Sequence, residues 1–341
     1  MKILFILINV LIFSNYLYAS NLFETSFNNI EFNSINIQDS KIEEINKIKF
    51  ESFKKILRKI LNNKNFNEIN DNLSEDFINT FIKNIIINDE KIINNKYAAK
   101  VKINFDKKRL VNYLREKKIP YVEYYPDKFL LIIFEHNELN QNLFSKNNTY
   151  YSYYLNNLKN NHLFQIPDLD INDRFILKKE DLKNKDLNKI INFGKKYNNN
   201  EIIIVHTNID NQLINYDLLI YSDGVVAEHK FYLNEYNLEN FFQTLEDFSI
   251  NIWKEINQIQ NNTLNIISCK IDYFNILELK EIRKNLNNNS IIQKLDIKSL
   301  AFKSVDYDIY YYGNEKIFFN ILKQNKLQIN KLENFCTIRL K

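Results

Sequence analysis

The stretch from Asp186 to Tyr232 constrains the fold more than any other part of the chain, because it joins three patterns of different period. An amphipathic helix is predicted from Asp186 to Tyr197. The continuous apolar run from Ile202 to Val205 then predicts a strand that is buried on both faces. Two alternating segments from Leu213 to Tyr232 follow, joined by a tight turn that contains Gly224. The sequence therefore predicts a helix, a buried strand and a hairpin within one sheet.

The remaining length allows further domains. At 341 residues, with 45% hydrophobic and 26% charged side chains, the chain is long and apolar enough for two or three folded domains. The predicted class is α+β with α/β character, in which a central mixed-sheet domain is flanked by two smaller domains. The predicted bounds are a signal peptide at 1–19, an N-terminal α+β domain at 20–122, a middle α/β domain at 127–262 and a C-terminal ferredoxin-like α+β domain at 263–341.

The N-terminal domain is predicted from alternating strand and helix patterns. A strand is expected from Asn28 to Ile37 and a long amphipathic helix from Lys41 to Leu61. A second helix is expected to start at Ser74 and to continue through Ile85, with Ser74 as its cap. Alternation from Tyr97 to Phe105 predicts a strand with one buried face, and Asp106 is expected to cap the helix that follows.

The middle domain is predicted to contain a second doubly buried strand, Phe129 to Phe134. A short helix from Tyr150 to Leu158 and a strand from His162 to Ile166 are expected between the two buried strands. A long helix from Leu238 to Ile259 is expected to close the domain. Its predicted core face consists of Phe241, Phe242, Leu245, Phe248 and Ile252.

The pattern restarts at Leu264. The predicted order from there is strand, helix, strand, strand, helix and strand, which is the ferredoxin-like order. The last predicted strands are Leu327 to Ile329 and Phe335 to Leu340. No internal repeat is evident in the sequence.

The N-terminus has the pattern of a secretory signal. Met1 and Lys2 precede an apolar run from Ile3 to Phe13, which is shorter than the roughly 20 residues of a membrane span, and Ala19 is the expected cleavage position. The expected location is the periplasm, with no transmembrane span in the mature chain. The alternative is anchoring in the inner membrane by an uncleaved N-terminal segment.

The two cysteines, Cys269 and Cys336, both fall in the C-terminal domain. In an oxidising compartment they could form a disulfide. We favour two separate small core residues, because free cysteine packs as a buried hydrophobe.

Several classes of function find little support. The four histidines lack the spacing of metal ligands, and no glycine-rich phosphate loop occurs, so neither a metal nor a cofactor is expected. A formal net charge of +4 is modest. Lysines and arginines are interleaved with glutamates on predicted helix faces, so no nucleic-acid partner is expected.

The patterns resemble a known family in four stretches: Phe53 to Ile60, Lys96 to Ile119, Phe193 to Val205 with the hairpin after it, and the final unit from Asn265. In these the chain is similar to the uncharacterised bacterial envelope family called domain of unknown function 2066. The middle domain is also similar in architecture to the amino-terminal domain of TolB and to lipoproteins that activate cell-wall synthases. His206 departs from the family pattern, in which a glycine is usual. The resemblance implies an envelope protein and no active-site residues.

Two groups of residues are candidates for contact with a ligand or partner. Glu135 and His136 follow one buried strand and His206 ends the other, at the edge where α/β sheets usually bind ligands. A carboxylate beside an imidazole could transfer protons, which gives the alternative of a small-ligand-binding or hydrolytic protein. The second group lies on the predicted hairpin and consists of Asp223, Gly224, Glu228 and His229.

We expect a non-enzymatic interaction or scaffold module rather than an enzyme, because no nucleophile, phosphate loop or metal site accompanies these residues. The expected partner is an envelope protein or a component associated with peptidoglycan. Tyrosine clusters at 121–125, 150–154 and 310–312 could line such a contact, although AT-rich codon usage explains most of them.

Overall fold

The computed structural model describes residues 22–126, 128–136, 141–158, 161, 163–210, 213–222, 224–260, 263–332 and 335–340. The predicted signal peptide at 1–19 lies outside these residues. The chain divides into two compact units, of which one is Tyr125–Gln258 and the other joins the chain up to Tyr124 with Ile259–Lys341. The predicted division into three domains stays a prediction. The predicted mixed α+β class is confirmed, because helices accompany three separate sheets.

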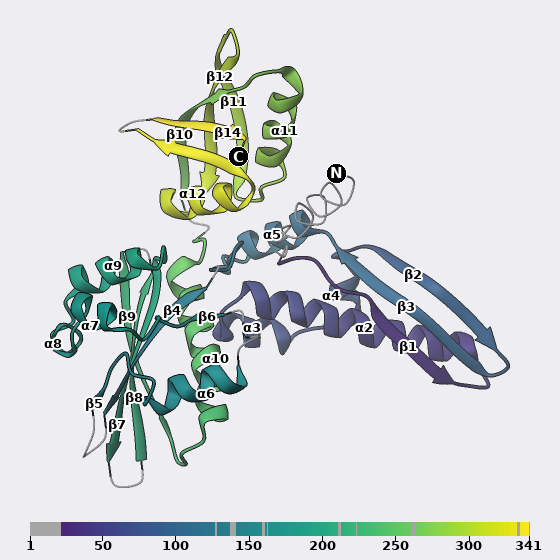
Figure 1. Ribbon diagram of the computed structural model, residues 1–341. Coiled ribbons are helices and arrows are strands. Elements are labelled where there is room, and N and C mark those ends of the chain that lie inside the picture. The colour runs from purple at the N-terminus through teal and green to yellow at the C-terminus, as the bar shows by residue number, and fades with distance from the viewer. Residues whose placement is uncertain are drawn as a thin grey trace, which may run out of the picture. The chain divides into compact units, whose positions relative to one another are not determined.

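The N-terminal part of the first unit is a three-stranded antiparallel sheet with helices on it (Figure 1). Its elements are β1 (Asn28–Asn33), α2 (Ile37–Ile60), α3 (Asn63–Asn70), α4 (Glu75–Asn79), β2 (Ile82–Ile93), β3 (Lys96–Phe105) and α5 (Lys107–Glu116). The sheet order is β1-β3-β2. The predicted strand at β3 is confirmed, and Asp106 caps α5 by accepting a hydrogen bond from the backbone N–H of Arg109.

Two predictions in this part are wrong at their boundaries. Asn36 caps α2, so the helix begins at Ile37 and the first strand ends earlier than expected. Ser74 caps a helix as predicted, but that helix ends at Asn79 and Ile85 lies in β2. The isoleucines of β2 have a spacing that also fits a helix. They form a strand because their side chains are β-branched and because β2 pairs along the whole of β3.

The middle unit is a sheet between two layers of helices (Figure 1). Its strands are β4 (Phe129–His136), β5 (Gln141–Asn142), β6 (Phe164–Gln165), β7 (Glu201–Asp210), β8 (Leu213–Ser222) and β9 (Val225–Leu233). Its helices are α6 (Thr149–Asn157), α7 (Ile171–Ile176), α8 (Lys179–Lys183), α9 (Leu187–Lys196) and α10 (Leu238–Asn257). β4 pairs parallel with β6 and β7, and β7, β8 and β9 are antiparallel, which confirms the predicted mixed sheet.

Helices α7 to α9 cover one face of this sheet and α6 and α10 cover the other (Figure 1). On the first face, α9 approaches β7 closely at Gly194, where an added Cβ would lie 2.6 Å from the carbonyl oxygen of Asn199 and from Ile202 Cδ1. On the second face, Tyr216 of β8 packs against Phe241 of α10, with ring centroids 4.8 Å apart.

Several aromatic residues are placed differently from the sequence prediction. Phe248 was expected on the core face of α10, but the residue is 37% exposed, and its ring stacks on Phe231 with centroids 5.4 Å apart. Tyr121, Tyr150 and Tyr151 are almost fully buried. These tyrosines therefore build the core and do not line a partner surface.

The C-terminal part of the first unit is a five-stranded sheet. Its elements are β10 (Leu264–Asp272), α11 (Ile276–Asn287), β11 (Ile292–Ala301), β12 (Ser304–Tyr312), α12 (Glu315–Gln324), β13 (Leu327–Lys331) and β14 (Phe335–Leu340). The predicted order of elements is confirmed. The strand order is β11-β12-β10-β14-β13, so β14 inserts beside β10 and runs parallel to it. This added strand is the departure from the predicted ferredoxin-like sheet.

The cysteines are bonded to each other, so the favoured prediction of two separate core residues is wrong. Cys269 on β10 lies opposite Cys336 on β14, with Cα atoms 4.4 Å apart, and the two sulfurs form a disulfide. That separation is within the range a disulfide requires. Both residues are also buried, as expected.

The N-terminal and C-terminal sheets repeat one arrangement, βαββα, which the sequence did not reveal; the N-terminal copy has two additional short helices, α3 and α4, before its second strand. Both place the first strand next to the third and the second strand outside, in the orders β1-β3-β2 and β10-β12-β11. The pair Asn33 and Lys96 corresponds to the pair Asp272 and Ser304. The backbone N–H of the next residue donates to the hairpin turn in both copies, Ser34 to Asn95 O (2.9 Å) and Tyr273 to Lys303 O (3.0 Å).

The correspondence continues without a gap through the hairpin and the helix after it. Each hairpin has a two-residue turn, and Asp106 and Asn314, 208 positions apart, each cap a helix of 10 residues. The first helices are capped by Asn36 and Asn275. We call the two copies the N-terminal and C-terminal modules.

Candidate functional site

Two adjacent parallel strands of the middle unit bring His136 and His206 together on one face of the sheet. His136 is the last residue of β4, whereas His206 lies four residues before the end of β7, so the prediction that His206 ends its strand is wrong. Phe134 on β4 lies opposite His206 on β7, and His136 lies opposite Asn208. The imidazole of His206 stacks on Phe134 with centroids 4.7 Å apart, and the two imidazole centroids are 6.0 Å apart. The structure therefore brings these two predicted residues together on neighbouring strands of the sheet.

A chain of polar contacts extends this cluster across the sheet. His136 Nδ1 lies 3.2 Å from Asn208 Oδ1, and Asn208 Nδ2 donates to Asp217 at 3.4 Å. Lys230 forms an ion pair with the same carboxylate at 3.0 Å. The sequence prediction missed Asn208, Asp217 and Lys230. The signal was present in the alternation of the hairpin, which puts paired residues of neighbouring strands on one face.

The surroundings of His206 change its pKa. Burial lowers the pKa of His206, and the nearby Asp217 carboxylate opposes that shift while His136 and Lys183 add to it. Among the described residues, the buried Nε2 of His206 has no hydrogen-bond partner. The ring is therefore held neutral at pH 7, as expected for an imidazole packed on an aromatic ring.

Glu135 does not belong to this cluster, because neighbouring residues of a strand point to opposite faces. Its carboxylate accepts hydrogen bonds from the backbone N–H of Thr149 (3.2 Å), the Thr149 hydroxyl (2.5 Å) and Asn142 Nδ2 (3.3 Å). It thereby fixes the start of α6, where a negative charge is favourable. The carboxylate and imidazole pair considered for proton transfer is not formed.

The hairpin candidates lie apart from the strand ends. Asp223 lies outside the described residues, and Gly224 is exposed with φ +98°, a backbone conformation that favours glycine. Glu228 forms an ion pair with Lys185 at 2.6 Å, and His229 is exposed on the edge strand β9. These residues share a strand and a turn but converge on no common point.

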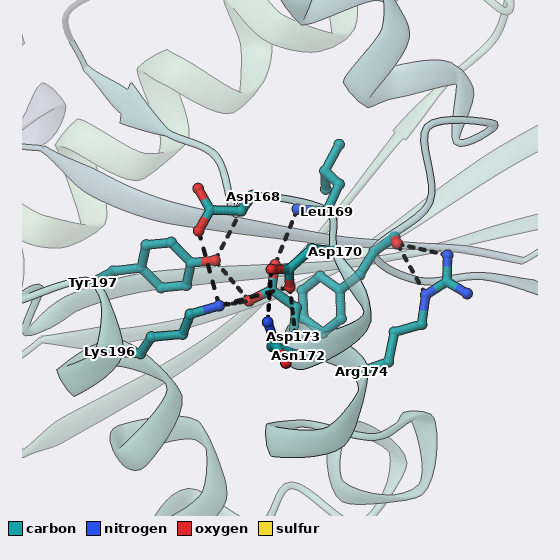
Figure 2. A network of polar contacts seen from close by, with 9 residues as sticks. Asp168, Leu169, Asp170, Asn172, Asp173, Arg174, Lys196 and Tyr197 are labelled. Carbon is teal, nitrogen blue, oxygen red and sulfur yellow. Dashed lines mark hydrogen bonds and ion pairs between the residues drawn. The ribbon is translucent and has the colours of Figure 1, made fainter.

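The densest polar network of the middle unit surrounds Asp173 and was not predicted (Figure 2). Asp173 is fully buried, and its carboxylate accepts hydrogen bonds from the backbone N–H of Leu169 (3.0 Å), Lys196 Nζ (2.6 Å) and the Tyr197 hydroxyl (2.6 Å). Asp170 accepts from the backbone N–H of Asp173 and so caps α7. The network ties α7 to the end of α9.

The protonation of this network follows from its contacts. The hydrogen bond to Asp173 raises the pKa of Lys196, and burial raises the pKa of Tyr197 to about 12. Lysine and tyrosine therefore stay protonated at neutral pH and both donate to the carboxylate. Since each of these groups already has a partner, the network works as a clamp and leaves no free acid or base.

The C-terminal module exposes large apolar side chains at one end. They come from the end of β11 and the two-residue turn after it, and from the segment after β10 and the first turn of α11. Their exposed fractions run from 57% to 90%, and they are Phe274, Ile276, Leu277, Leu300 and Phe302. The hydrogen bond from Tyr273 N to Lys303 O joins the two segments, so these side chains lie at the same end of the module, which we call the C-terminal apolar end.

The N-terminal module repeats this feature at corresponding positions. Ile35, which corresponds to Phe274, is 96% exposed, and Ile92, which corresponds to Leu300, is 54% exposed. Contiguous exposed apolar surface is uncommon in soluble proteins and usually marks a contact site. A large apolar residue in a hairpin turn, as at Phe302, was the signal in the sequence that could have pointed to this surface.

The fold and these surfaces define a mixed α+β protein with two βαββα modules and a separate three-layer unit. No model of a known protein family and no curated protein matches the chain. The resemblance to the family of unknown function 2066 therefore stays a prediction. Within the described residues, no cluster of three or more metal-ligating side chains occurs, and none of the helices is both long and apolar enough to cross a membrane.

Proposed function

We propose that the chain is an exported, non-enzymatic protein of the bacterial cell envelope that acts by binding another envelope protein. The observation that carries this proposal is the C-terminal apolar end, with its five large exposed side chains. Burying a phenylalanine or leucine of this kind contributes about 1.5 to 3 kcal/mol. Burial of several such side chains by a partner would therefore stabilise the complex strongly.

The charges around this surface favour a protein partner over a membrane. Glu278 accepts a hydrogen bond from the backbone N–H of Phe274, Lys303 lies in the turn, and Asp306 follows on β12. A rim that contains both positive and negative charges is typical of protein interfaces, whereas surfaces that bind anionic lipid are rich in lysine and arginine.

The proposed export to the periplasm is supported by two features. The apolar run from Ile3 to Phe13 has the form of a secretory signal. The Cys269–Cys336 disulfide is of the kind that persists in oxidising compartments. A peptidoglycan-associated protein is one form that the partner could take.

Site-specific photo-crosslinking in intact cells tests this proposal. A photoreactive phenylalanine analogue at Phe302 is expected to give one discrete protein adduct, and Phe274→Ser is expected to remove it. The matched control is Phe175 on α7, whose side chain is 71% exposed in the other unit. An adduct with lipid, or equal adducts at both positions, would contradict the proposal, as would no adduct at Phe302.

A further inference from the structure

The two modules differ at one sheet edge, and the difference points to a binding site. In the C-terminal module, β10 is flanked by β12 on one side and by β14 on the other. In the N-terminal module the corresponding strand, β1, pairs with β3, and no strand within the described residues pairs with its other edge. This edge thus carries a strand in one copy, whereas in the other copy the described residues provide none.

The backbone of β1 is oriented to accept such a strand. Ser34 donates its backbone N–H to Asn95 O, so residues at even positions of β1 face β3. The N–H and C=O groups of Asn29, Glu31 and Asn33 therefore face the open edge. The corresponding residues of β10 include Lys270, which lies opposite Thr337 of β14.

Side-chain burial shows what a further strand would cover. Phe32 is only half-buried, whereas its counterpart Ile271 is fully buried beside β14. β14 places two fully buried side chains, Cys336 and Ile338, on the helix side of its sheet. On the helix side of the N-terminal module, a small cavity of about 60 Å³ lies between α2 and the chain that enters β1, next to Asn28.

We propose that the open edge of β1 binds an extended segment of a partner protein, which adds to the sheet as a strand parallel to β1. The segment takes the position that β14 holds against β10 and presents apolar residues at alternate positions toward α2. Strand addition of this kind draws affinity from backbone hydrogen bonds and specificity from alternate side chains. This inference rests on the proposed function and names the form of the partner.

The parallel direction excludes a second copy of this chain that pairs through the same strand. Two copies related by a twofold axis would join their β1 strands antiparallel. β1 is also short and carries the charged Glu31, which is ion-paired with Lys96. Such features discourage unspecific pairing of edge strands.

The test combines crosslinking with a backbone block in the full chain. A photoreactive phenylalanine analogue at Glu31 is expected to give a protein adduct, while the same analogue at Lys270, the counterpart beside the filled edge, gives none. Asn29→Pro removes an N–H from the open edge and leaves the pairing with β3 intact, so it is expected to lower the adduct at least tenfold. Asn29→Ala keeps the N–H and is expected to keep the adduct.

Each outcome decides the inference. No adduct at Glu31, an equal adduct at Lys270, or an adduct that survives Asn29→Pro would overturn it. If Asn29→Pro fails to fold by circular dichroism, Asn33→Pro provides the same block. An adduct at Phe302 without one at Glu31 refutes only strand addition, whereas the absence of adducts at both positions refutes the proposed function as well.

Discussion

The disulfide gives the most direct quantitative prediction about stability. Cys269 and Cys336 are 67 residues apart. Closing a loop of that length in the unfolded chain stabilises the folded state by about 4 kcal/mol in the chain-entropy account. With a urea dependence of about 2 kcal/mol per molar, reduction is expected to lower the midpoint of unfolding of the C-terminal module by about 2 M.

The assay can separate this module from the middle unit, because the chain has a single tryptophan, Trp253, which is buried in the middle unit. Reduction is expected to shift the urea transition seen by far-ultraviolet circular dichroism and to leave the transition in Trp253 fluorescence in place. The variant Cys269→Ala/Cys336→Ala should behave like the reduced protein, with a further loss from the missing sulfur atoms. Thiols that react in the native, unreduced protein, or a transition that does not move on reduction, would refute the reasoning.

Three further predictions concern the middle unit and use urea unfolding followed by Trp253 fluorescence. Lys196→Met leaves the buried Asp173 carboxylate without its cation and should cost about 3 kcal/mol. Because the folded-state pKa of Lys196 is raised, its contribution should be constant below about pH 10.5 and decline above it, and a flat profile there would argue against the clamp. The pKa of His206 is lowered from 6.5, so the unfolded chain binds the proton more readily and stability should fall below that pH. His206→Phe should remove much of this fall, and an unchanged slope would show that other groups cause it. Gly194→Ala should cost about 2 kcal/mol because its Cβ meets backbone at 2.6 Å, and a neutral result would contradict the close approach.

Elements with a strong local pattern could be predicted from the sequence. The alternation of β3 and the continuous apolar run of β4 each identify a strand. Burial of one face leaves alternating apolar residues, and burial of both faces leaves an uninterrupted apolar run. β2 could not be predicted in this way. Its isoleucines also fit a helix, and only the pairing with β3 selects the strand.

The candidate site could be predicted only in part. The neighbouring positions of His136 and His206 followed from the expectation of parallel strands. Glu135 and His136 point to opposite faces because β4 continues to His136, whereas the predicted strand ended at Phe134. The bond between Cys269 and Cys336 required the insertion of β14 beside β10, and the sequence holds no sign of that topology.

Amide hydrogen exchange on the purified full chain tests the central claim most directly, because the two modules provide matched residues. The account predicts that the outward-facing amide of Glu31 on β1 exchanges rapidly, while the amide of Lys270 at the corresponding position of β10 is protected by β14. Addition of the crosslinked partner is predicted to slow the exchange of Glu31 and to leave that of Lys270 unchanged. Equal protection of the two amides in the free chain, or no change at Glu31 when the partner binds, would contradict the account.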